Sequence, residues 1–193
     1  SSFSGAAGTT YVLRWTISNG VCASSSDDVT MVINADPSVS NAGPDQTGVT
    51  AVCGTSATLA GNVPVIGTGT WSVIAGAGGS FVNANSATTV FNGTAGVTYT
   101  LRWTISNGVC TSSIDEVDIS LQQAPTVSAA GPDQSVCITG GIPATLAGNV
   151  PVVGSGLWSI VSGAGGSFGL ASDPGSSFSG AAGTTYVLRW TIS

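Results

Sequence analysis

One motif occurs three times in this chain and constrains its fold more than any other feature. Residues 98–110 read TYTLRWTISNGVC, a close copy occupies residues 10–22, and a copy that stops at its serine ends the chain at Ser193. The arginine of the motif lies at positions 14, 102 and 189, so the copies are 88 and 87 residues apart. Repetition at the length of a small domain predicts a tandem array of similar domains.

The repeats divide the chain into three segments. Residues 1–36 are predicted to be the C-terminal part of a repeat, residues 37–124 a complete repeat, and residues 125–193 a repeat that lacks its last strand. Residues 1–18 and 176–193 are identical, whereas the middle copy has diverged. The full period is therefore 175 residues, or two domains. We predict that the sequence is a piece of a longer array, in which Asn-Gly-Val-Cys follows Ser193.

Short alternating runs between turn residues predict an all-β fold. Turn signals recur about every 8 to 12 residues, which is typical of antiparallel β-sandwiches. A repeat of this length fits a sandwich of the immunoglobulin kind. In the first repeat, Asn19-Gly20 predicts a tight two-residue turn between its strands. In the middle repeat we expect strands near residues 38–41, 47–52, 56–62, 69–74, 80–82, 88–92, 97–106 and 116–122.

Strand alternation separates predicted core residues from surface residues, because successive side chains of a strand point to opposite faces. Along residues 97–106 the inward set is Tyr99, Leu101, Trp103 and Ile105. In the last strand of the repeat the inward set is Val117, Ile119 and Leu121. Trp71 and Trp158 share a Gly-x-Trp-Ser context, and we expect both in the core, on the opposing sheet.

The four cysteines predict a disulfide framework. Within the complete repeat, Cys53 and Cys110 form the only pair, and a bridge between them would close a 57-residue loop. Such a bridge contributes about 4 kcal/mol by loop-entropy reasoning. Cys22 and Cys137 are expected to pair outside residues 1–193. Zinc is disfavoured, since the sequence has no histidine and no Cys-x-x-Cys. Disulfides imply an oxidising, extracellular setting.

The charge content excludes several function classes. Charged residues are 6% of the chain, the net charge is −6, and the three arginines are its only cations. Without a basic patch, binding to nucleic acid or to an anionic membrane is not expected. No apolar run approaches the roughly 18 residues of a membrane-spanning helix. With no histidine or lysine there is no base to activate a nucleophile, so we expect neither an enzyme nor a cofactor.

The charged positions have structural interpretations. Arg102 lies on the outward face of its strand, within reach of Asp115 and Glu116, so a cross-strand ion pair is expected. A clamp for a substrate carboxylate is the functional alternative.

Asp45 and Asp133 recur in Gly-Pro-Asp-Gln. Calcium normally takes six to eight oxygens, so a turn whose aspartate accepts backbone N–H groups is favoured over a metal site.

Two further motifs have competing interpretations. Gly76-Ala-Gly-Gly79 and its copy at residues 163–166 resemble phosphate loops. Both lack a following helix and a lysine, so turns are expected.

Asn92-Gly93-Thr94 is an N-glycosylation acceptor pattern. The tryptophans would suit a sugar-binding module, but their inward parity favours core positions.

The order of the motifs carries a resemblance to a known class of repeat. The middle repeat contains Gly-Pro-Asp-Gln, a cysteine, Leu-Ala-Gly-Asn, Gly-x-Trp-Ser, Tyr-x-Leu-x-Trp-x-Ile and Asn-Gly-Val-Cys. In this order they resemble the tandem immunoglobulin-like or PKD-like repeats of very large secreted bacterial surface proteins, over essentially the whole chain. The resemblance implies adhesion or stalk formation at the cell surface.

These observations predict a structural extracellular protein whose tandem domains self-assemble into a stalk or fibre. Its expected partners are other copies, neighbouring repeats of the same chain, and glycans. The first alternative is an adhesin module that binds a glycan or a host protein. The second is a non-catalytic spacer of a secreted enzyme.

Overall fold

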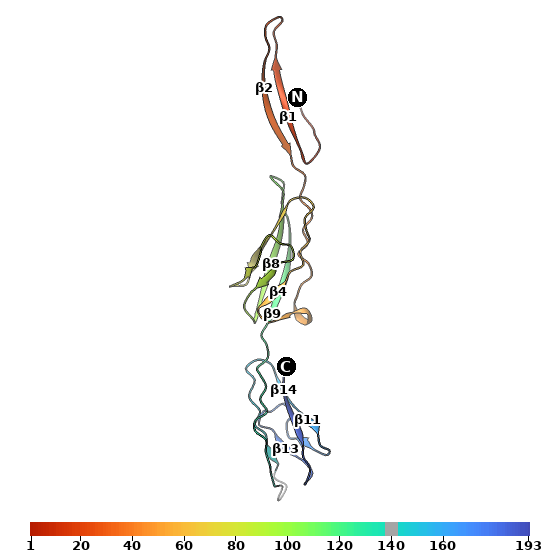
Figure 1. The fold of residues 1–193 in the computed structure, drawn as a ribbon, viewed down its shortest axis with the longest axis vertical. Helices are drawn as coiled ribbons and strands as arrows, with labels where there is room; N and C mark the ends of the chain where they lie inside the picture. Colours follow the sequence, from red (N-terminus) through yellow and green to blue (C-terminus); the bar gives the residue numbers. More distant parts are fainter. Residues whose placement is uncertain (138–142) are drawn as a thin grey trace. The chain divides into compact units, whose positions relative to one another are not determined.

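The computed structural model describes residues 1–137 and 143–193, which form two compact units, Ser1–Gln122 and Gln123–Ser193. Figure 1 shows the strands of both units. The first unit contains the β1–β2 hairpin and the whole middle repeat. The second contains the third repeat.

The middle repeat is a sandwich of two sheets. One sheet has the order β3 (Val52–Cys53), β9 (Ser113–Gln122), β8 (Val97–Ser106), β5 (Thr68–Ala75). The other has the order β4 (Ser56–Thr58), β7 (Val90–Asn92), β6 (Ser80–Phe81). All neighbours are antiparallel except β3 and β9, which run parallel. This arrangement confirms the predicted immunoglobulin-like β-sandwich class.

Strand β8 forms the centre of the core, as its alternation predicts. Its inward residues and the facing residues of β9 are almost completely buried. The second sheet covers them with Ala57 and Phe91. Fully buried aliphatic and aromatic side chains of this kind each contribute about 1.5–3 kcal/mol. The buried β8 and β9 residues are Tyr99, Leu101, Trp103, Ile105, Val117, Ile119 and Leu121.

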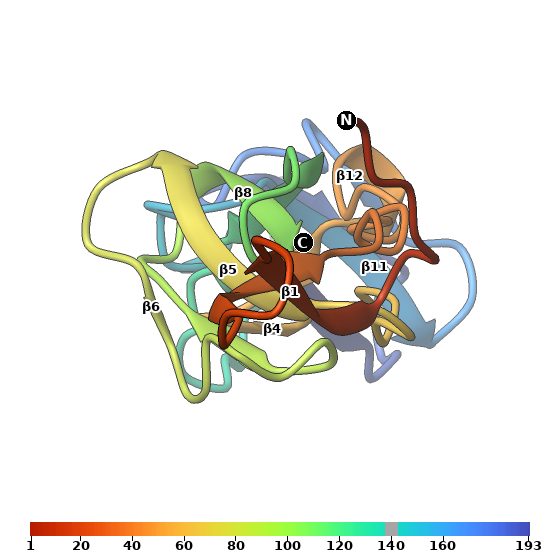
Figure 2. The ribbon, with the colours of Figure 1, turned by 90° about the horizontal axis from the view of Figure 1, so that it is seen from above.

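The position of Trp71 differs from the prediction. Trp71 is buried, but β5 lies beside β8 in the same sheet, as Figure 2 shows, and Trp71 is the register partner of Trp103. The two ring centroids are 5.0 Å apart. Trp158 likewise pairs with Trp190 in its own sheet. The prediction that these tryptophans lie on the opposing sheet was wrong. Alternation predicts which face of a sheet a side chain lies on, but it does not predict which strands are neighbours.

The first repeat contributes a two-stranded hairpin, β1 (Thr9–Ile17) and β2 (Ser25–Ile33). The predicted two-residue turn is not formed. A turn of that type needs positive φ at both central residues, but in the described residues only glycines have positive φ, with Gly20 at 58°. Residues 18–24 form a longer connection, in which the Cys22 N–H donates to the Asn19 carbonyl. The turn after β8 repeats this geometry.

Two expected strands of the middle repeat have other structures. Residues 38–41 form no strand. They are held by single hydrogen bonds, such as that from the Ser38 N–H to the Ile66 carbonyl at 3.0 Å. Within residues 47–52, Gly48–Thr50 forms a 3-10 turn, η1. The Thr50 hydroxyl bonds the Thr47 carbonyl at 2.8 Å, and such local side-chain bonds compete with strand pairing.

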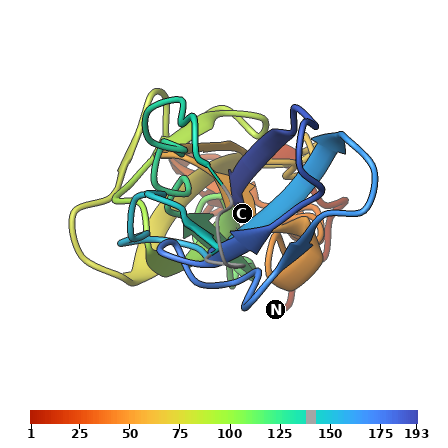
Figure 3. The same cartoon turned by 90° about the horizontal axis from the view of Figure 1, so that it is seen from below.

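The second unit repeats part of the sandwich. One sheet has the order β10 (Ala144–Thr145), β13 (Ser177–Ser179), β12 (Ser167–Phe168). The other contains β11 (Gly156–Ser162) and β14 (Val187–Ile192), the two blue strands seen side by side in Figure 3. β14 corresponds to β8. Within residues 123–137 and 143–193, β11 is its only paired neighbour.

Candidate functional site

The buried tryptophans belong to the core. Trp71, Trp103 and Trp158 have exposed fractions of 2%, 0% and 3%. The Trp103 indole N–H donates to the Asn62 carbonyl at 3.1 Å, and the Trp158 N–H donates to the Asp173 carbonyl at 3.1 Å. A buried ring whose N–H is already bonded offers no stacking platform to a sugar. Trp15 in the hairpin differs, since 70% of it is exposed.

Tyr99 organises the glycine-rich loop that the sequence linked to phosphate binding. Its hydroxyl accepts a hydrogen bond from the Thr94 N–H at 2.8 Å and donates to the Ala77 carbonyl at 2.9 Å. The loop follows β5 and leads directly into β6, with no helix after it. Gly76 has φ 93°, and a side chain there would meet the Tyr99 ring. The loop is a turn packed on Tyr99.

The arginines form cross-strand ion pairs. Arg14 is bonded to both carboxylate oxygens of Asp28, at 2.7 and 2.8 Å. The Arg102 Nε donates to Glu116 at 2.9 Å, so Glu116 rather than Asp115 is its partner. The Arg14 guanidinium lowers the pKa of Asp28. Both pairs are solvent-exposed, and such pairs contribute about 0–1 kcal/mol to stability at most.

Asp45 has the structural role that was favoured over calcium binding. Its carboxylate accepts the Asp118 N–H at 2.9 Å, fixing the Gly-Pro-Asp-Gln segment against β9. Asp115 similarly accepts the Ala42 N–H at 2.8 Å. A shallow hollow of about 350 Å³ is lined by Asp45, Glu116 and Asp118 together with Thr100 and Val117. The described residues contain no group of three or more acidic, histidine or cysteine side chains placed to hold a metal ion.

The predicted Cys53–Cys110 disulfide is not formed. Both cysteines are free thiols. Cys53 pairs with Gln122, where β9 ends, while Cys110 lies in the turn before β9 begins at Ser113. A ten-residue strand spans roughly 30 Å, whereas bridged cysteines need Cα atoms within about 7 Å. Because β3 runs parallel to β9, it carries Cys53 away from Cys110.

The remaining predicted positions are exposed. Cys22 lies in the β1–β2 connection, and Cys137 is also at the surface. Asn92 ends β7 with its side chain exposed, which leaves the glycosylation pattern accessible. The last residue of this pattern, Thr94, donates its backbone N–H to the Tyr99 hydroxyl.

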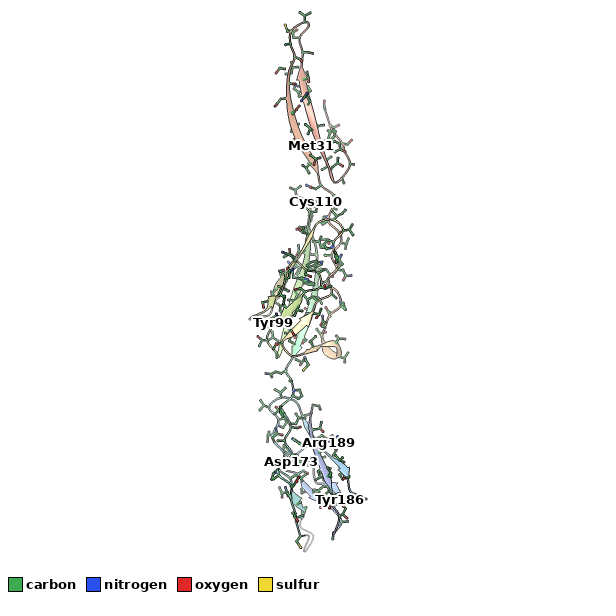
Figure 4. All side chains as sticks on the ribbon, in the orientation of Figure 1. Met31, Tyr99, Cys110, Asp173, Tyr186 and Arg189 are labelled. Carbon is green, nitrogen blue, oxygen red and sulfur yellow. The ribbon has the colours of Figure 1, made fainter. Side chains whose placement is uncertain are left out.

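One hollow was not anticipated from the sequence. It lies in the second unit, has a volume of about 690 Å³, and opens along β14 and the segment around Gln134. Its apolar lining includes Leu146, Tyr186 and Leu188. Figure 4 labels Tyr186 on this unit.

The sheets and core define the class of this protein as an immunoglobulin-like β-sandwich. Among solved structures the chain is similar to the solution structure of the PKD domain from the KIAA 1837 protein. The two are 23% identical with a TM-score of 0.37, and the match covers 50% of this chain and 92% of that chain. No protein-family model and no curated protein matches the chain. None of the residues described by the structure form a helix long and apolar enough to cross a membrane.

Proposed function

We propose that this chain is a structural extracellular repeat protein whose tandem domains form a stalk or fibre. The observation that supports this most directly is that the repeated residues hold the sandwich together. The tryptophan pair recurs with centroids 5.0 and 5.1 Å apart. The bond from Trp103 to Asn62 recurs between Trp190 and Asn149, again at 3.1 Å. Residues retained for packing fit a protein that transmits force.

The connection between the first two repeats supports the same function. The Asn107 side-chain amide donates to the Ala35 carbonyl at 2.8 Å. A side chain at Gly108 would meet Asn34 at 2.8 Å. The turn after β8 therefore packs against the chain that enters the repeat at Pro37. These contacts restrain the short linker, and a restrained linker resists bending between domains.

The composition fits a surface location. Charged residues are 6% of the chain, and the outward strand faces present serine and threonine hydroxyls instead. The hydroxyl groups of such faces can form hydrogen bonds with water, glycans or other copies. Asn92 is exposed and accessible for modification. Both features support the proposed location outside the cell, at the cell surface.

Single-molecule extension of the chain tests this function. The middle repeat of 88 residues should lengthen the chain by roughly 300 Å in one step when it unfolds. Electron micrographs of purified protein should show filaments that need no added ligand. Saturable binding of a glycan or host protein by monodisperse two-repeat fragments, abolished by one loop substitution, would instead establish an adhesin and overturn the stalk.

A further inference from the structure

The chain enters the middle repeat through residues 40–54, the entering segment, which lies along β9. Before η1 this segment forms no strand. The Ser40 N–H donates to the Ser113 hydroxyl at 2.9 Å, and the Ala42 N–H donates to the Asp115 carboxylate at 2.8 Å. In both bonds a side chain of β9 takes the place of the carbonyl that a paired strand would offer. Side chains therefore hold a part of the chain that strand pairing leaves out.

The bonds between the entering segment and β9 continue to the end of β9. The Asp45 carboxylate accepts the Asp118 N–H at 2.9 Å, and the Gln46 N–H donates to the Asp118 carbonyl at 2.8 Å. Beyond η1, β3 pairs with the last two residues of β9. The Gly54 N–H then donates to the Gln122 carbonyl at 2.9 Å. The entering segment is thus bonded to β9 from its first residue to its last.

The entering segment and β9 run in the same direction. The bonds made by Ser40, Ala42 and Asp45 each join residues that are 73 positions apart. A constant difference in residue number means that both segments advance together, whereas in antiparallel pairing the sum of the residue numbers stays constant. The bridge between Gln46 and Ile119 is likewise parallel, as is the pairing of β3 with β9. The whole contact is therefore a parallel one.

This direction determines how tension acts on the contact. In a stretched chain, force reaches the repeat through Pro37, ahead of the entering segment, and leaves it through Gln122, the last residue of β9. Because the two segments are parallel, tension pulls them in opposite directions along their common axis. All the bonds between them then carry the force together, and they must break together before the repeat can extend.

The antiparallel pairing of β9 with β8 responds differently to the same force. Val97, the first residue of β8, pairs with Leu121 near the end of β9 where the force is applied. Tension would therefore peel β9 from β8 one residue pair at a time, beginning at that end. Bonds that break one after another resist less force than bonds that share it. The parallel contact is therefore the part of the repeat that resists extension first.

The polar side chains of the contact recur in the other repeats. Two of them come from β9 and two from the entering segment. Their copies are Ser25 and Asp27 in the first repeat, and Ser128 and Asp133 in the third. The sequence therefore supplies the same hydrogen-bonding groups at corresponding positions of each repeat.

We propose that the parallel contact between the entering segment and β9 is a mechanical clamp that carries tension across the repeat. Asp45 and Asp115 are its main side-chain bonds, because a carboxylate that accepts a backbone N–H forms a stronger hydrogen bond than a neutral group. The inference rests on the proposed function, since it requires tension along the chain. It goes further by identifying the part of the domain that resists this tension.

Single-molecule pulling of the full chain at constant force tests the clamp. Asp115→Ala should make the middle repeat unfold roughly tenfold faster at a given force, because the Ala42 N–H loses its acceptor. Thr89→Ala is the matched control. Thr89 is 4% exposed and accepts the Asn83 N–H at 3.0 Å, but it precedes β7 and lies outside the clamp. This control should lower the urea midpoint and leave the unfolding rate under force nearly unchanged.

Variants of Asp45 provide a second test, and they should fold because Asp45 is exposed. Asp45→Ala should also unfold faster under force, whereas Asp45→Asn retains an acceptor oxygen and should restore most of the resistance. Rates under force that follow the urea midpoints alone, with Asp115→Ala no faster than an equally destabilised Thr89→Ala, overturn the clamp. Filaments and the long extension step that persist in that case leave the stalk function standing.

Discussion

Two glycines leave space for the paired tryptophan rings. Gly69 lies two positions before Trp71, and a side chain at Gly69 would meet the Trp103 ring. Gly156 has the same relation to Trp190 in the second unit. The Gly-x-Trp motif therefore makes room for the tryptophan of the neighbouring strand. Its function is packing, because no backbone strain requires glycine at either position.

Replacement of Gly69 by alanine should lower stability through overpacking. The added methyl group meets an indole ring with no free space, which typically costs about 1–3 kcal/mol. Urea denaturation followed by tryptophan fluorescence measures the change. Ser72→Ala, an exposed position on the opposite face of β5, should leave the midpoint unchanged. Equal midpoints for the two variants would show that the glycine is dispensable.

Removal of the Trp103 side chain should have a larger effect. Trp103 is 0% exposed and donates to the Asn62 carbonyl, so Trp103→Ala creates a cavity and leaves that carbonyl without its partner. The expected loss is about 3–5 kcal/mol. Trp15→Ala is the comparison, because Trp15 is exposed in the hairpin. A small effect at Trp103 would contradict its core role.

Arg14 should control the titration of Asp28. The guanidinium stabilises the carboxylate and lowers the pKa of Asp28. A lowered folded-state pKa contributes stability at pH values above the ordinary aspartate pKa, and that contribution is lost as pH falls through the lowered value. Carbon NMR titration of Asp28 should show a midpoint that rises in Arg14→Gln. An unchanged midpoint would mean that the ion pair does not form in solution.

At the scale of elements, the direction of strand β3 determines whether Cys53 can reach Cys110. β3 runs parallel to β9 and ends beside Gln122, where the chain leaves the repeat. The turn before β9 lies beside the linker where the chain enters the repeat. Cys53 therefore lies where the chain leaves the repeat, and Cys110 lies near the place where the chain enters it. A bridge within one repeat conflicts with this topology.

Cys53→Ser should consequently leave the stability of the 193-residue chain nearly unchanged. Cys53 is exposed and unbridged, and surface substitutions of this kind usually change stability by less than about 0.5 kcal/mol. Urea midpoints of the chain and the variant provide the measurement. Without reduction, Cys53 and Cys110 should each accept one alkylating group. A loss of several kcal/mol would restore the predicted intra-repeat bridge.

At the scale of the whole molecule, the repeat spacing suggests where a bridge belongs. Asn34 occupies the position in the first repeat that Gln122 occupies in the middle repeat. Cys53 pairs with Gln122, and Gly108 packs against Asn34. A cysteine placed like Cys53 in the preceding repeat would therefore lie close to Cys110. This spacing predicts a bridge between consecutive repeats.

A chain in which residues 37–106 replace residues 1–18 tests this arrangement. It contains a complete repeat in front of the middle one. Under a disulfide oxidant, which accepts the two electrons and two protons of the thiols, the added Cys53 should bridge to Cys110. Peptide mapping without reduction identifies the pair. A bridge between the added Cys53 and Cys22, within the added repeat, would contradict the assignment.

The sequence by itself determined the local features of this protein. Period-2 alternation identified β8 and β9, their buried face and the all-β class, because side-chain direction in a strand depends only on position along it. The Arg102 ion pair and the structural role of Asp45 also followed from short-range patterns. Repetition predicted an organisation into similar domains. These features need no knowledge of which strands are neighbours.

The tertiary structure decided everything that depends on strand neighbours and their direction. It placed Trp71 beside Trp103 in one sheet, and it separated Cys53 from Cys110 by the length of β9. Strand order and direction join residues far apart in the chain, so local alternation carries no information about them.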